Sequence, residues 1–150
     1  MQRAFVLGFM VLLMLCFVGC GKSSVVNENN SFFAKAVKGI TTDEIALNDI
    51  TAFDWDTVYT FPPYTSKESI EEIIGFESNS IEETVSEGMT QLLFVKGQEV
   101  VCSICGYSNN LGYGFLFGAY SGDYLAIDKN DDATFAVSNS EGKVYLTYDK

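Results

Sequence analysis

The sequence predicts an α+β protein: a mostly antiparallel sheet of about five to seven strands with one or two short helices, preceded by a signal peptide. Three observations support this fold class. Residues 52–61 alternate aromatic with polar side chains, residues 65–75 carry helical spacing, and the chain after Gly88 is a series of short apolar segments separated by turns. We therefore expect a single α+β domain over residues 32–150.

The N-terminus has the organisation of a secretory signal peptide. Residues 4–18 form an uncharged apolar run that follows the positive charge of Arg3. A membrane-spanning helix needs about 20 apolar residues, so this run is short for a membrane span, and polar residues follow it at 22–24. We expect residues 1–19 to be removed, and we expect residues 4–18 to form a helix that packs poorly on the domain.

The cleavage site has a more specific form. The sequence Phe17-Val18-Gly19-Cys20 resembles the lipobox of bacterial lipoproteins, with Phe17 where leucine is commonest. The resemblance implies cleavage before Cys20, which would carry diacylglycerol and palmitate as the first residue of a protein anchored at the cell membrane, on its extracytoplasmic side. Cys16 would leave with the signal peptide. An ordinary signal peptide and an uncleaved anchor are the alternatives.

The next two segments connect this anchor to the domain. Residues 20–31 are predicted to be a flexible tether, because residues 21–31 are small and polar apart from Val25 and Val26. Residues 32–40 are compatible with a short helix or with an irregular docking segment.

Strand and helix signals then follow in order. Period-two alternation predicts a half-buried strand over residues 52–61, which the prolines at 62–63 end. The sequence Thr65-x-x-Glu68 forms a capping box for a short helix. Three isoleucines at i, i+3 and i+4 give that helix one apolar face, and Gly75 suits its C-terminal cap.

The remainder of the chain reads as β-structure. Strands are predicted at residues 91–95, 99–104, 113–120, 124–128, 134–138 and 144–148. Because the connections are short, we expect strands that are neighbours in sequence to pair antiparallel.

A second resemblance covers the segment from Trp55 to Tyr64. Its pattern W-D-x-V-Y-x-F-x-P-Y is similar to that of a family of uncharacterised bacterial lipoproteins, in which a short helix follows. That family has no assigned activity, so the resemblance implies no functional residues. Asp54 and Asp56 would share one face of the strand, where paired carboxylates would bind a cation or serve acid–base chemistry; a solvated strand face is the commoner explanation.

The composition excludes several classes of function. Residues 1–19 contain Arg3 and no acidic residue, so the mature chain would carry eight lysines against 20 carboxylates, a net charge of −12. This charge repels nucleic acid, which we exclude as a partner. The sequence also has no histidine, so histidine-dependent catalysis and histidine metal ligands are excluded.

Cys102-Ser103-Ile104-Cys105 is a C-x-x-C sequence at the end of a predicted strand. Residues three apart in a strand point to opposite faces, so a disulfide between Cys102 and Cys105 would need a bulge. An extracytoplasmic location favours that disulfide, but we favour two free thiols. Redox catalysis lacks the helix that should follow the motif, and a zinc site lacks further ligands.

Two further motifs have simpler explanations. Residues 128–132 are similar to the start of a calcium loop, but Ala133 and Asn139 stand where Gly and Glu are required, so a turn between strands is the better explanation. In residues 112–118 three glycines share one strand face. A glycine face allows close approach of a helix or an aromatic ring, or forms a shallow groove.

The function that these observations favour is a binding or accessory module at the cell surface, and not an enzyme. The alternatives are a hydrolase that depends on carboxylates, and an inhibitor or interaction module that acts on another protein. Tyr64, Tyr113 and Tyr120 are the candidate exposed aromatic contacts. We expect two kinds of partner: the membrane through the lipid on Cys20, and an unknown protein or cell-envelope polymer. No catalytic residue, metal or cofactor is predicted.

Overall fold

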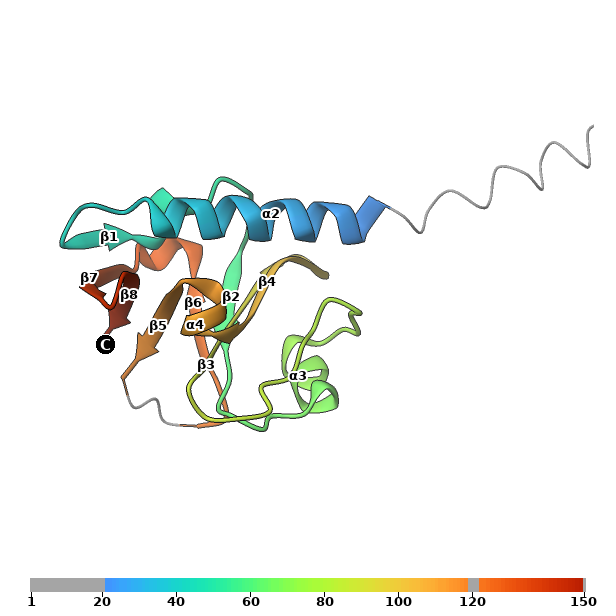
Figure 1. Cartoon of the computed structure of the whole chain (residues 1–150). Coiled ribbons are helices and arrows are strands. Elements are labelled where there is room, and N and C mark those ends of the chain that lie inside the picture. The colour runs from blue at the N-terminus through green and yellow to red at the C-terminus, as the bar shows by residue number, and fades with distance from the viewer. Residues whose placement is uncertain (1–20, 119–121, 150) are drawn as a thin grey trace, which may run out of the picture.

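The computed structural model describes residues 21–118 and 122–149 (Figure 1). The signal peptide, Cys20 and Tyr120 lie outside the described residues, so the helix expected over residues 4–18 stays a prediction.

In chain order the elements are α2 (Gly21–Lys38), β1 (Glu44–Ala46), the 3₁₀ turn η2 (Leu47–Ile50), β2 (Thr57–Thr60), α3 (Lys67–Ile74), β3 (Met89–Lys96), β4 (Glu99–Tyr107), α4 (Ser108–Leu111), β5 (Tyr113–Phe117), β6 (Leu125–Asp128), the 3₁₀ turn η3 (Lys129–Asp131), β7 (Thr134–Ser140) and β8 (Lys143–Tyr148). None of the helices within these residues is long and apolar enough to cross a membrane.

The strands form two four-stranded sheets, with the orders β1-β7-β8-β5 and β4-β3-β2-β6. All paired strands are antiparallel except β5 and β8, which run parallel. The α+β class and the mostly antiparallel pairing are therefore confirmed, while the strands divide between two sheets instead of forming one. In Figure 1, α2 lies along one side of the molecule and α3 lies on the opposite side.

Short turns produce the expected antiparallel neighbours in two places. Strands β3 and β4 form a hairpin at Gly97, whose φ of 56° suits glycine, and β7 and β8 form another at Glu141-Gly142. The expectation is wrong for β4 and β5, for β5 and β6, and for β6 and β7, because each of these pairs is divided between the two sheets. The connection over residues 118–124 joins different sheets, so β5 pairs with β8 while β6 pairs with β2.

The boundaries around the aromatic segment also differ from expectation. Strand β2 covers only Thr57–Thr60 of the predicted 52–61 segment, because both of its partners end beside Thr57, which pairs with Val95 near the end of β3 and with Asp128 at the end of β6. Ser66, not Thr65, is the N-cap of α3, and its Oγ accepts the backbone N–H of Ser69 at 3.2 Å. Gly75 adopts the left-handed conformation that ends the helix, as predicted.

Residues 21–31 belong to α2, and the flexible tether predicted there is corrected. The helix continues without a break through most of the segment 32–40. The helix forms because Val26, Phe33 and Val37 lie on one side of α2 and are all buried. Only Val26 of these three falls within residues 21–31, so this segment taken alone does not show the helical spacing.

The polar residues of α2 close the open edge of strand β4. The side-chain amide of Asn29 donates to the carbonyl oxygen of Val101 at 2.7 Å, and the side-chain oxygen of Asn30 accepts the N–H of Ser103 at 2.8 Å. A neighbouring strand would satisfy the same two backbone groups. Two asparagine side chains thus replace a strand and protect an edge that would otherwise pair with another chain.

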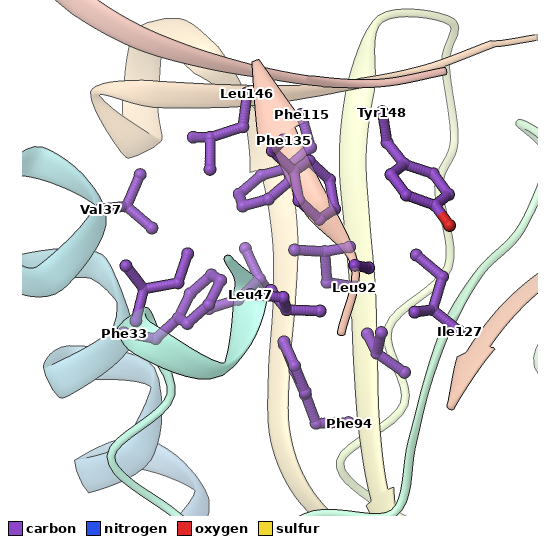
Figure 2. Packing of buried hydrophobic residues seen from close by; sticks show 14 of the residues in the cluster. Phe33, Val37, Leu47, Leu92, Phe94, Phe115, Ile127, Phe135, Leu146 and Tyr148 are labelled. Atoms are coloured by element: carbon purple, nitrogen blue, oxygen red, sulfur yellow. The ribbon is translucent and has the colours of Figure 1, made fainter. Parts of the chain in front are cut away.

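The main core lies between α2 and the two sheets (Figure 2). Phe33 of α2 packs edge-on against Phe94, with ring centroids 5.3 Å apart, and stacks on Phe115 at 5.8 Å. Trp55 is buried against Phe94 in the same cluster, so it serves the core and not an exposed binding surface. Substituting such a residue by alanine costs several kcal/mol in general, about 3–5.

A smaller core covers the other face of the sheet that contains β3. Ile70 of α3 and Ile81 of the following segment pack there with Phe61 and Leu93. The isoleucines of α3 therefore form the apolar face that the sequence predicted, and they hold α3 and the segment after it on this sheet.

Glycine permits close packing at one point of strand β5. A Cβ atom on Gly114 would lie 3.0 Å from the ring of Tyr145, which is tighter than ordinary contact. Of the interpretations considered for residues 112–118, the approach of an aromatic ring is therefore the one found at Gly114.

The asparagine pair gives a test of the edge closure. Replacing Asn30 by Ala leaves the N–H of Ser103 without its partner, and we expect the free energy of unfolding to fall by about 1 kcal/mol. Urea denaturation measures it. Asn27→Ala is the matched control, because this exposed position of α2 makes the same change in helix propensity. Equal effects at positions 27 and 30 would contradict the edge role.

Candidate functional site

Asp54 and Asp56 hold turns together and do not form a carboxylate pair. The Asp54 carboxylate contacts the ammonium groups of Lys96 and Lys129, the latter at 3.0 Å. The Asp56 carboxylate accepts the backbone N–H of Gly97 at 2.7 Å. Each carboxylate therefore has its own structural partners, and the geometry favours the structural explanation over cation binding or acid–base catalysis.

The three tyrosines proposed as exposed contacts have different positions. Tyr113 is buried in the main core, so its prediction as an exposed contact is wrong. The sequence placed its ring on the aromatic face of the strand, and this face packs inward against Phe33. Tyr120 lies outside the described residues, while Tyr64 is exposed, as expected.

The two cysteines of the C-x-x-C sequence are free thiols. Cys102 is buried, and Cys105 is half-buried three residues further along β4, in a part of the strand whose pairing with β3 is regular, so the disulfide does not form. Burial raises the pKa of the Cys105 thiol to about 11, with a smaller contribution from Glu82, and it raises the pKa of Cys102 as well. Both thiols are therefore poor nucleophiles at neutral pH, because little thiolate is present.

The segment similar to a calcium loop is a capped turn. The Asp128 carboxylate accepts the N–H of Asn130 at 2.8 Å, and the Asp131 carboxylate accepts the N–H of Asp128 at 3.1 Å. These carboxylates therefore cap η3. Across residues 21–118 and 122–149, no group of three or more acidic or cysteine side chains is placed to hold a metal ion.

The strongest candidate for a functional site is a pair of apolar side chains on the side of the molecule that carries α3. Tyr64 is 67% exposed and Val85 is 69% exposed, the highest values for large hydrophobic residues in the described part of the chain. The backbone N–H of Tyr64 donates to the carbonyl oxygen of Thr84 at 2.9 Å, so the two side chains come from adjoining backbone segments. We call Tyr64 and Val85, with residues 62–65 and 82–87 around them, the Tyr64–Val85 surface.

Hydrogen bonds attach this surface to the domain. The buried Thr84 has its hydroxyl 3.5 Å from the carbonyl oxygen of Pro62, and the Glu83 carboxylate accepts the N–H of Lys67 at the start of α3. From strand β3, the side chain of Gln91 donates to the carbonyl oxygen of Glu82 at 2.7 Å. Tyr64 and Val85 therefore project from an anchored support.

The backbone of Tyr64 is unusual. Its φ of 69° lies in the left-handed region, which non-glycine residues adopt at some cost. Pro63 precedes it, and the hydroxyl of Thr65 donates to the carbonyl oxygen of Pro62 at 2.8 Å across the same turn. A strained residue that keeps a large aromatic side chain in solvent is a candidate for recognition.

Acidic side chains surround the surface. Between residues 62 and 88 the chain has seven glutamates and a single lysine, Lys67, whose ammonium lies 3.6 Å from the Glu71 carboxylate. Glu82, Glu83 and Glu87 next to Val85 are all exposed. An exposed apolar pair inside an acidic rim is suited to binding a partner with apolar and basic groups.

Sequence reasoning found Tyr64 but missed Val85. Val85 is a single valine in a run of glutamate, serine and threonine, and this run has no periodicity that predicts a helix or a strand face. Comparisons with models of protein families, with curated proteins and with solved structures found no match to this chain.

The reactivity of Cys105 tests whether its thiol is half-buried and free. Because the pKa of Cys105 is about 11 instead of its ordinary 9.0, far less thiolate is present at pH 8. We expect iodoacetamide to alkylate Cys105 roughly a hundredfold more slowly in the native protein than in urea, and the native rate to rise with pH up to about 11. Peptide mass spectrometry measures both rates. Equal rates at pH 8 would contradict the burial of Cys105, and a Cys102–Cys105 disulfide in the mature protein would contradict the free thiols.

Proposed function

We propose that this chain is a lipid-anchored lipoprotein on the extracytoplasmic side of the cell membrane, and that its α+β domain is a binding or accessory module. The lipobox resemblance of residues 17–20 supports the anchor on Cys20, as does the apolar run before it. Two acyl chains hold a protein stably at a membrane, so the domain needs no membrane-binding surface to remain there.

The observation that carries the binding role is the Tyr64–Val85 surface. The exposure of the Tyr64 and Val85 side chains does not stabilise the fold, and the left-handed backbone conformation of Tyr64 lowers stability. The partner is a protein or a cell-envelope polymer that offers an apolar group and, opposite the glutamates, basic groups. Nucleic acid does not fit a rim of this charge.

Two alternatives remain from the sequence. The carboxylate-dependent hydrolase is less favoured, because Asp54 and Asp56 are each engaged by structural partners and do not converge on a substrate position. An inhibitor or interaction module would use the same Tyr64–Val85 surface. That alternative differs from the proposal only in what binding does to the partner: an inhibitor would block the partner's activity.

The lipid anchor is tested by substitution of the two N-terminal cysteines. We expect Cys20→Ser to abolish incorporation of a labelled palmitate analogue and to move the protein out of the membrane fraction, since the acylated thiol is lost. Cys16→Ser is the matched control and should leave both unchanged. Labelling that survives in Cys20→Ser, or that is absent from the parent protein, would rule out the anchor.

The binding surface is tested by photo-crosslinking in intact cells. A photoreactive phenylalanine at position 64 should give a discrete adduct, whereas the same residue at the exposed Tyr107 should not. Val85→Ser should reduce the adduct from position 64 several-fold, because it removes half of the apolar pair. An identical pattern at positions 64 and 107 would show that Tyr64 has no special partner.

A further inference from the structure

One flank of α2 carries an apolar pair that the fold does not use. Val25 is 49% exposed and Phe32 is 52% exposed, and their spacing of seven residues places both on one flank of the helix. The buried stripe of Val26, Phe33 and Val37 occupies a different side. Val25 and Phe32 are therefore free to contact something outside the domain.

Charge is divided sharply between α2 and the rest of the chain. The helix sequence has three lysines against one glutamate, a net charge of +2, and Lys35 is exposed near Phe32. Lys38, at the C-terminal end, lies with its ammonium 5.8 Å from the ring centroid of Tyr113. Residues 39–150 have five lysines against 19 carboxylates, a net charge of −14. An anionic surface would attract α2 and repel everything else.

We infer that α2 lies on the membrane surface, with Val25 and Phe32 at the level of the lipid headgroups and Lys35 near anionic lipids. The inference rests on the proposed lipid at Cys20, which directly precedes Gly21 in the chain and would bring the N-terminal end of α2 to the bilayer. A helix with exposed apolar residues and basic side chains binds at this interface. A bilayer is favoured over a protein partner because one occupant then explains the anchor, the apolar pair and the charge division.

The orientation of α2 fixes the orientation of the domain. Asn29 and Asn30 bind the backbone of β4, and Phe33 is inserted between the sheets, so α2 cannot rotate independently. In Figure 1, α2 and α3 lie on opposite sides of the molecule. The Tyr64–Val85 surface beside α3 is then held on the side of the molecule away from the helix that contacts lipid, where a partner can reach it.

Tryptophan quenching tests this orientation in the full-length, lipid-bearing protein. The protein is reconstituted into vesicles of phosphatidylcholine and phosphatidylglycerol that include acyl-brominated phosphatidylcholine, which quenches tryptophan on contact. Phe32→Trp is compared with Leu116→Trp, since both positions are 52% exposed and the native Trp55 is buried in each. We expect fluorescence to be lost at position 32 and retained at position 116, and the loss to shrink when phosphatidylglycerol is omitted.

The outcomes separate this inference from the proposed anchor. Vesicles that carry the protein but leave Trp at position 32 unquenched overturn the orientation and keep the anchor. A parent protein that does not float with vesicles overturns both. Concentration-dependent shielding of position 32 in detergent would mean that a second copy covers α2, which also overturns the inference. Val25→Trp is a second reporter on the same flank if circular dichroism shows that Phe32→Trp is unfolded.

Discussion

The contact between α2 and strand β4 is the constraint on which the rest of the structure depends. Strand β4 ends the order β4-β3-β2-β6 and would expose backbone groups at Val101 and Ser103. The side chains of Asn29 and Asn30 satisfy these groups, and Phe33, one turn further along α2, enters the core between the sheets. The same helix therefore protects the edge of β4 and closes the core. Its position also leaves the flank that carries Val25 and Phe32 exposed.

How far the sequence predicted this fold depended on the range of the interactions involved. Local patterns located β3 and β4 with the turn at Gly97, and they located α3 with its Gly75 cap, because periodicity and turn chemistry act over a few residues. The α2 helix was missed over residues 21–31, since its asparagines are stabilised by a strand more than 70 positions away in sequence. The parallel pairing of β5 with β8 was missed for the same reason.

The candidate sites follow the same division. Asp54 and Asp56 looked like a functional pair only while their partners were unknown; Lys96, Gly97 and Lys129 come from other parts of the chain and give each carboxylate a structural role. Aromatic residues at alternate positions identify a strand but do not tell which face is solvent, which is why Tyr113 was misplaced. Tyr64 was predicted, but its neighbour Val85 was brought beside it by tertiary contacts.

The distribution of charge connects the two exposed apolar pairs. An anchored domain with a net charge of −14 outside α2 is pushed away from an anionic bilayer, while α2, at +2, is drawn toward it. The attraction and the repulsion both favour an orientation with α2 toward the bilayer. The anchor at Cys20 would favour the same orientation, because it directly precedes α2. In the proposed arrangement the glutamates around Tyr64 and Val85 would have two effects: they would keep this surface away from the lipid, and they would select partners of opposite charge. On the proposed orientation a flexible tether would lose the first effect, so the helical structure of residues 21–31 would matter for the proposed function.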